Sequence, residues 1–174
     1  WSQAREVQLE HADRRGPRVV RTLAELWGLG SLSVKELRQV IVGNELMLFS
    51  LYALVLLSGT GGCGALEHPA EPKKEDSASI WRTEIVRLLL QVEGFQLLTF
   101  AQGLLGAKSA KPTSLLTLNL PTMGQWIHGS RVCADLPAAS SIGKSSSGHW
   151  NTMSLKEYPP ALCRALGGCI DRKS

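Results

Sequence analysis

The glycine-rich segment LVLLSGTGGCGALEHPAEP, residues 54–72, restricts the folds open to this chain more than any other. Residues 59–64 match the GxGxxG spacing of a dinucleotide-binding turn, which requires a strand before the glycines and a phosphate-binding helix after them. Pro69 and Pro72 leave no room for such a helix. We therefore expect the glycines to end a helix and to turn the chain into a short strand at residues 65–67.

A long helix is predicted immediately before these glycines. Ser33 and Glu36 have the spacing of a capping box, in which both side chains satisfy backbone amides at a helix start. The leucine-rich stretch 46–57 lacks the alternation of a half-buried strand, so the helix is expected to continue to about residue 57. The longest apolar run, 47–57, is about half of the roughly 20 residues that a spanning helix needs. A soluble chain without a membrane partner is expected, and its leucine-rich face would favour association if it were left uncovered.

The elements after the glycines predict the fold class. Apolar residues at helical spacing between residues 80 and 92 indicate a second helix ended by Gly94, and residues 95–100 and 114–120 have the composition of strands. A strand, a helix and a strand within about 35 residues have the length of one βαβ unit, which forms a right-handed, parallel crossover. The predicted class is α/β, a partial Rossmann-like three-layer sheet with a parallel βαβ unit and a terminal strand-loop-strand.

This topology predicts where a site would lie. The carboxyl ends of parallel strands share one edge of the sheet, where open α/β folds bind ligands. Glu67 and His68 would lie there beside Gln102, and the loop that follows would bring Lys108 and Lys111 to the same edge. We predict that these five side chains bind an anion or a polar ligand. In the alternative interpretation, which the sequence leaves open, the glutamate caps a backbone amide and the lysines are only solvated.

Charge and composition divide the chain into four parts. The net charge of +4 permits a nucleic-acid partner without requiring one. Residues 1–19 form a basic arm that is expected to be disordered, and residues 20–124 hold the α/β domain. Residues 125–153 are rich in glycine and serine and are expected to be irregular. Residues 154–174 are expected to hold a short helix, ended by the glycine pair 167–168, and a tail.

No metal or nucleotide motif is predicted. The four cysteines are expected to be thiols because the sequence shows no export signal. No spacing of cysteine and histidine matches a zinc motif. The P-loop-like residues 143–145 lack both the earlier glycine and a preceding strand. An intracellular protein is expected, and a nuclear one if it acts on DNA.

Several segments together resemble a known family. EHPAEP, SIWRTEIVRLLL, FAQGLLGAKSAKPTSLLTLNLP and LKEYPPALCRAL resemble a family of retroelement-associated proteins, over about residues 20–167. The domain of that family is itself similar to the C-terminal half of a class I, cytosine-type DNA methyltransferase. The residues that match its pattern are Glu67, His68, Pro69, Trp81, Gly106, Lys111, Pro112 and Thr113.

The resemblance implies a catalytic role for Glu67, which in such enzymes holds a flipped base while a cysteine attacks the ring. The glycine-rich cofactor strand and the proline–cysteine motif of these enzymes are not in this sequence, and Cys63 precedes the strand. The resemblance therefore implies a fragment of a DNA methyltransferase that is inactive and binds no cofactor alone. It would use S-adenosylmethionine only together with the missing N-terminal half. The alternatives are a non-catalytic nucleic-acid-binding module of a retroelement polyprotein and a remnant that does not fold alone, so enzymatic activity stays uncertain at this stage.

Overall fold

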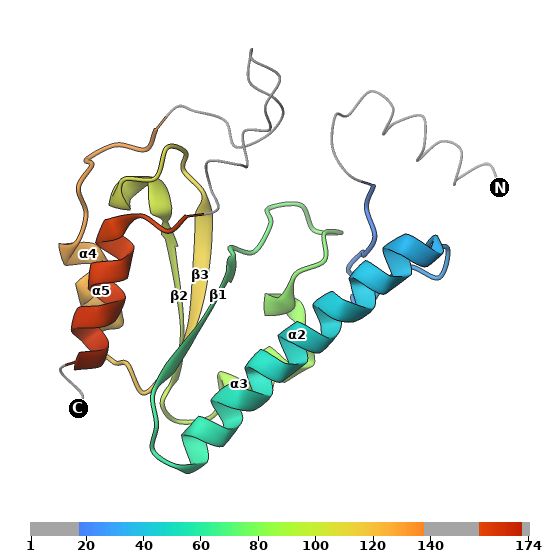
Figure 1. Cartoon of the computed structure of the whole chain (residues 1–174), viewed down its shortest axis with the longest axis horizontal. Coiled ribbons are helices and arrows are strands. Elements are labelled where there is room, and N and C mark those ends of the chain that lie inside the picture. Colours follow the sequence, from blue (N-terminus) through green and yellow to red (C-terminus); the bar gives the residue numbers. More distant parts are fainter. Residues whose placement is uncertain (1–17, 138–156, 172–174) are drawn as a thin grey trace.

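A computed structural model describes residues 18–137 and 157–171 of the chain (Figure 1). Most of the basic arm, the P-loop-like residues 143–145 and much of the segment expected to be irregular lie outside these residues. The described elements, in chain order, are α2 (Val34–Gly59), β1 (Gly64–Pro69), the 3-10 helix η1 (Ile80–Arg82), α3 (Glu84–Leu89), β2 (Phe95–Ala101), the 3-10 helix η2 (Gln102–Leu105), β3 (Pro112–Leu118), α4 (Met123–Gly129) and α5 (Pro160–Asp171).

The three strands form a sheet in the order β1-β3-β2, and β3 is antiparallel to both of its neighbours. The predicted parallel, Rossmann-like unit is therefore wrong. The cause is the short connection after β2, which returns the chain as a hairpin, so that β3 takes the place between β1 and β2 that a parallel pair would need. β1 and β2 still run in the same direction, because each is antiparallel to β3, in the manner of a split βαβ motif.

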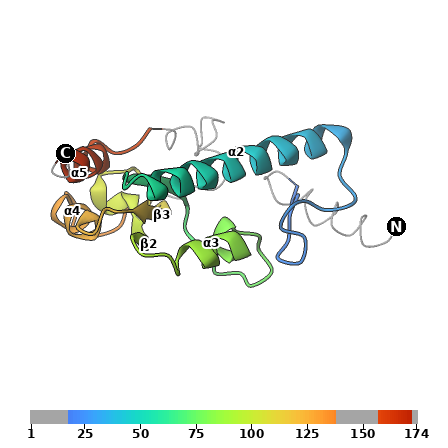
Figure 2. The same ribbon diagram turned by 90° about the horizontal axis from the view of Figure 1, so that it is seen from below.

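Two layers of helices cover the sheet and form a separate apolar cluster on each face (Figures 1 and 2). Alternate side chains of β3 enter the two clusters, as the pleat of a strand requires. Leu115 packs with α4 and α5, while Leu116 and Leu118 pack with η1, α3 and the C-terminal half of α2. β3 is buried on both faces from Thr113 to Leu118, although three of its residues, Thr113, Ser114 and Thr117, are polar.

The helix and the glycine turn predicted from the sequence are confirmed. Ser33 and Glu36 make both hydrogen bonds of the capping box, and α2 continues to Gly59. The amides of Gly61 and Gly62 then donate to carbonyls in the last turn of the helix, and Gly61 takes a φ of 69°, which glycine adopts without strain. The glycines are thus a helix end and a turn into β1.

α2 is much less buried than a core helix. Of its 26 residues only Val40, Leu51 and Leu54 are buried. By length and composition alone it could cross a membrane, although a soluble core helix or a signal sequence meets the same criterion. The large apolar side chains that it exposes are Val34, Leu37, Ile41, Val42, Leu46, Leu48, Phe49, Tyr52, Val55, Leu56 and Leu57.

The other helices differ from expectation for local reasons. The second helix is interrupted, because Ser79 caps η1 and Thr83 caps α3. α5 runs through the glycine pair 167–168 and does not end there. A Cβ atom on Gly168 would lie 2.9 Å from the Trp126 ring, so this glycine allows α5 to approach α4 closely. α4 itself occupies the start of the segment that was expected to be irregular.

The central position of β3 predicts a large cost for truncating it. Leu116→Ala should lower the free energy of unfolding by about 2–5 kcal/mol, because it removes a fully buried side chain and leaves a cavity. Leu97→Ala on β2 is the matched control, since Leu97 is 37% exposed and should cost clearly less. Chemical denaturation monitored by circular dichroism measures both. Equal losses would show that β3 is not the centre of the sheet.

Candidate functional site

The sheet divides the five predicted site residues between its two faces. Glu67 and His68 are neighbours on β1, in register with Leu115 and Ser114 of β3. Successive side chains of a strand point to opposite faces. Glu67 therefore points toward the layer of α5, and His68 points toward the layer of α2 and η1. The prediction had placed both in one site.

On the α5 side, Glu67 belongs to a network that we call the Glu67 cluster, formed by Glu67, Gln102, Thr113 and Tyr158. Gln102 Nε2 donates to Glu67 Oε1 at 3.3 Å and to Thr113 Oγ1 at 2.9 Å. The Tyr158 hydroxyl donates to Glu67 Oε2 at 2.8 Å. Both carboxylate oxygens are thus bonded within the protein. The cluster links β1 and β3 to the segment that leads into α5.

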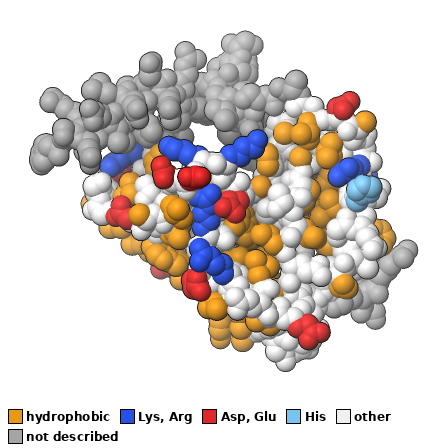
Figure 3. All heavy atoms as spheres, turned by 180° about the vertical axis from the view of Figure 1, so that it is seen from behind, with side chains coloured by type: hydrophobic (Ala, Val, Ile, Leu, Met, Phe, Trp, Pro, Cys, Tyr) orange, Lys and Arg blue, Asp and Glu red, His pale blue; other side chains and the backbone are white. Residues whose placement is uncertain are grey.

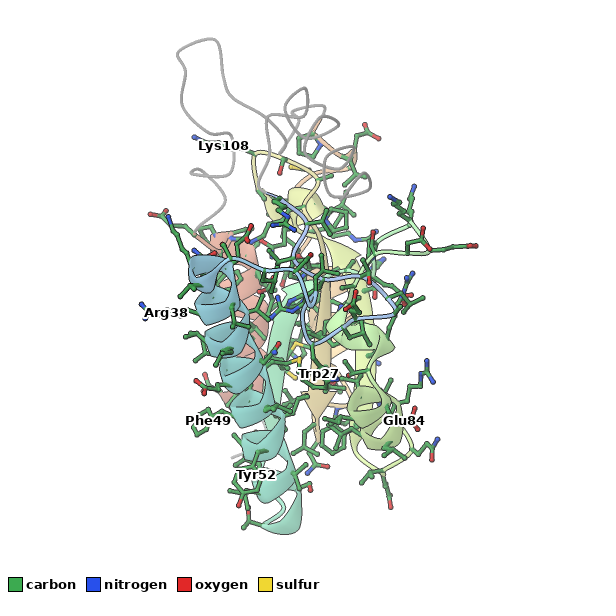
Figure 4. All side chains as sticks on the ribbon, turned by 90° about the vertical axis from the view of Figure 1, so that its right-hand side faces the viewer. Trp27, Arg38, Phe49, Tyr52, Glu84 and Lys108 are labelled. Carbon is green, nitrogen blue, oxygen red and sulfur yellow. The ribbon has the colours of Figure 1, made fainter. Side chains whose placement is uncertain are left out.

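The two lysines differ in their relation to this cluster. Lys111 Nζ lies 5.2 Å from the centroid of the Tyr158 ring, a cation–π distance. Lys108 is exposed and projects from its loop at one end of the molecule (Figure 4). The structure therefore brings Glu67, Gln102 and Lys111 together, and leaves Lys108 outside the group.

Tyr158 is the member of the cluster that sequence reasoning missed. Burial, followed by the hydrogen bond to Glu67 and the charge of that carboxylate, raises the pKa of Tyr158 to about 12. The phenol therefore keeps its proton and acts as a donor. Gln102 is completely buried, and its Oε1 has no partner among the described residues. These properties are those of a structural brace, because the one unbonded polar atom of the cluster, Gln102 Oε1, is buried out of reach of a substrate.

The opposite face holds a pocket of about 370 Å³, between the loop before α2, α2 itself, β1 and η1. We call it the His68 pocket. Most of its wall is apolar, with a few polar groups among the aliphatic and aromatic side chains. Its lining residues are Arg21, Leu26, Trp27, Gly43, Asn44, Leu46, Met47, Ser50, Leu66, His68, Ala78, Ser79, Ile80 and Thr83.

Polar contacts hold one wall of the His68 pocket in place. Arg21 Nη2 donates to the Val40 carbonyl at 3.1 Å and to Asn44 Oδ1 at 2.8 Å. Asn44 Nδ2 in turn donates to the Trp27 carbonyl at 2.9 Å. These bonds fasten the loop that carries Trp27 onto α2, and Figure 4 shows Trp27 between α2 and α3. The wall is therefore formed before any ligand arrives, as is usual for binding sites.

His68 is an uncharged group with a free acceptor in this pocket. Desolvation by burial lowers the pKa of His68 below its usual value, which favours the neutral imidazole near pH 7. Nδ1 lies 3.4 Å from the Pro69 carbonyl, which can only accept, so this contact assigns the proton to Nδ1. Nε2 then has a free lone pair, and no described residue forms a hydrogen bond with it. The Trp81 ring meets the imidazole edge to face, with centroids 5.9 Å apart.

Within the described residues, neither face of the sheet is distinguished by a candidate metal site or by an excess of charge. The described residues contain no group of three or more His, Cys, Asp or Glu side chains that could hold a metal ion, and all four cysteines are free thiols. The described residues include 12 Lys and Arg and 12 Asp and Glu, so the net charge of +4 comes from the remainder of the chain. Figure 3 shows cationic and acidic side chains interspersed on the face opposite to that of Figure 1.

Comparisons with protein-family profiles, with curated proteins and with solved structures found no match for this chain. The two candidate sites therefore rest on their own geometry.

The lowered pKa of His68 predicts a pH dependence of stability. In the unfolded chain His68 binds a proton near its ordinary pKa of 6.5, whereas in the folded chain it binds one only at lower pH. The free energy of unfolding should be constant with respect to this residue above about pH 6.5 and should fall as the pH drops below that value. Urea unfolding of the wild type and His68→Gln between about pH 5 and pH 8 measures this slope, which the variant should reduce. His128→Gln, on an exposed position of α4, should retain the wild-type slope; a loss there as large as in His68→Gln would contradict the assignment.

The raised pKa of Tyr158 predicts a second, alkaline signature. Tyr52→Phe leaves Tyr158 as the only tyrosine, so ultraviolet absorbance then reports its ionisation. The transition should lie at about pH 12, and adding Glu67→Gln should move it toward 10, because the acceptor charge is lost. Since the folded pKa exceeds the unfolded one, this residue's contribution to stability is complete below pH 10 and declines as the pH rises through 12. A transition near 10 in the Tyr52→Phe protein while it is still folded would refute the Glu67–Tyr158 bond.

Proposed function

We propose that this chain is a non-catalytic binding module for single-stranded nucleic acid, and that the His68 pocket receives one unstacked base. The observation that supports this most directly is the pocket itself, in which Trp27 and an uncharged His68 share a largely apolar cavity. Its volume of about 370 Å³ is at the lower end of the range of about 300–1,000 Å³ for small-ligand sites. That size suits a base or a nucleoside.

The chemistry of the pocket fits a flat heteroaromatic ring. Trp27 is 47% exposed, so part of its ring is open to stacking. Stacking on an aromatic side chain is the common way in which proteins hold unpaired bases. His68 Nε2 would accept a hydrogen bond from the exocyclic amine of adenine or cytosine, which thymine lacks. Trp27 would thus supply affinity, and His68 would supply the preference between bases.

The charge distribution favours contacts to bases over contacts to phosphates within the described residues. Their basic and acidic side chains are equal in number, and Arg18 is engaged by Glu36 at 3.3 Å. The excess positive charge lies in the rest of the chain, at Lys144, Lys156, Arg172 and Lys173, because the basic and acidic side chains of residues 1–17 are equal in number. We expect a modest salt dependence, since each phosphate contact adds only about 0.7 to the salt slope of a single strand.

The methyltransferase-fragment hypothesis is less well supported by this geometry. It requires Glu67 to contact a base, but both oxygens of Glu67 bond to other residues of the chain. It also rested on a parallel sheet, which this fold does not have. We therefore assign Glu67 to the stability of the fold and His68 to the ligand.

Fluorescence anisotropy with labelled single-stranded oligonucleotides tests the proposal at low salt. Trp27→Ala should weaken binding of all sequences by about 1–3 kcal/mol, because it removes the stacking surface. His68→Phe should keep most of the affinity and abolish a preference for adenine and cytosine over thymine of about 1 kcal/mol. Lys108→Ala, remote from the pocket, is the control and should affect all sequences equally and slightly. If the folded wild type binds no oligonucleotide, or if Trp27→Ala binds as tightly as the wild type, the proposal fails.

A further inference from the structure

The face of α2 that points away from the sheet is organised as a helix-pairing seam. Val42, Phe49 and Leu56 follow one another at intervals of seven, and Arg38, Glu45 and Tyr52 fill the alternate positions at steps of three and four. This is the a/d spacing of a coiled coil. Phe49 and Tyr52 are 69% and 60% exposed, and Figure 4 shows Arg38, Phe49 and Tyr52 on the outer side of α2.

This part of α2 exposes a large apolar area. Eleven large apolar side chains of α2 are exposed, each by more than a third. Six of them lie within residues 34–49 and outside the lining of the His68 pocket: Val34, Leu37, Ile41, Val42, Leu48 and Phe49. If each offers roughly 80–100 Å², about half of what a large side chain can bury, the six offer on the order of 600 Å². The largest apolar patch on a typical monomer is about 300–600 Å², and stable complexes bury about 600–1,000 Å² per partner.

The two charged residues of the seam indicate what covers it. Arg38 and Glu45 are seven residues, about two helical turns, apart, and neither is a member of the ion pairs found among the described residues. In a parallel pair of α2 helices in register, Arg38 would lie beside Arg38 of the other copy and Glu45 beside Glu45, and the like charges would repel each other. In an antiparallel pair with a two-fold axis between residues 41 and 42, each Arg38 would face Glu45 of the other copy. The same symmetry sets Val42 against Ile41 and Phe49 against Val34.

We propose that α2 pairs with α2 of a second copy of this chain, antiparallel and about a two-fold axis between residues 41 and 42. The opposite face of α2 packs on the sheet through Leu51 and Leu54, so pairing leaves the fold unchanged. The contact is isologous, because both copies use the same surface, and it closes as a dimer. The proposal does not depend on the function assigned to the His68 pocket.

Sedimentation equilibrium of the full chain, from about 1 to 100 μM, tests the pairing, since interfaces of this size bind at micromolar concentration or more tightly. The wild type should be a dimer, and Phe49→Glu should be a monomer with an unchanged circular dichroism spectrum. Val42→Lys is a second variant in case the first does not fold. Leu88→Glu, on α3 and 53% exposed as Val42 is, is the matched control and should remain a dimer.

A charge exchange tests the antiparallel register. Arg38→Glu should weaken the dimer at least tenfold, and combining it with Glu45→Arg should restore it. A wild type that is monomeric at every concentration, a dimer that survives Phe49→Glu, or a double variant without recovery would overturn the proposal. So would a wild type that forms only polydisperse aggregates, or one that is monomeric in solution and binds vesicles of phosphatidylcholine, which would identify α2 as a membrane helix.

Discussion

The burial of β3 between two strands and two helical layers is the constraint on which the rest of this structure depends. β3 supplies one partner for every ladder hydrogen bond of both β1 and β2. Its alternating side chains enter both apolar clusters, so removing β3 would disrupt both cores at once. Backbone polar groups at such depth must be paired, and an antiparallel strand on either side pairs them completely. The short hairpin from β2 makes this arrangement the one that the chain reaches most easily.

The same strand order creates the two different environments on either face of β1. Because β1 and β2 both run opposite to β3, their ends meet the start of β3 around Thr113. Gln102 donates to Glu67 and Thr113 there, and Tyr158 donates to Glu67, so both carboxylate oxygens of Glu67 are bonded within the protein and the segment leading into α5 is held in place. One residue further along β1, the imidazole of His68 enters an apolar pocket and retains an acceptor. A carboxylate bonded within the protein and an imidazole that keeps a free acceptor thus arise from adjacent residues, because a strand alternates its side chains.

α2 carries apolar side chains on two faces of one helix. Its C-terminal half completes the core with Leu51 and Leu54, and its N-terminal half extends beyond the sheet, where the loop before the helix packs on it (Figures 1 and 2). A helix that served only this core would need one apolar stripe. The second stripe buries nothing within the described residues, and its exposure is costly in water. A second copy that covers it would remove this cost and would leave the His68 pocket on the other side of the helix.

The sequence by itself determined the features that depend on neighbours along the chain. The capping box at Ser33, the glycine end of α2 and the apolar strands were predictable, because caps, turns and periodicity are local. The order and direction of the strands were not predictable. Each of the three apolar segments could pair with either of the other two, and only the hairpin between β2 and β3 decides which strands are neighbours. Tyr158 and Glu67 are 91 residues apart, and Gly168 of α5 lies so close to the Trp126 ring of α4 that an added Cβ atom would be 2.9 Å from it. Such contacts depend on which surfaces meet in space, and only the tertiary structure decides that.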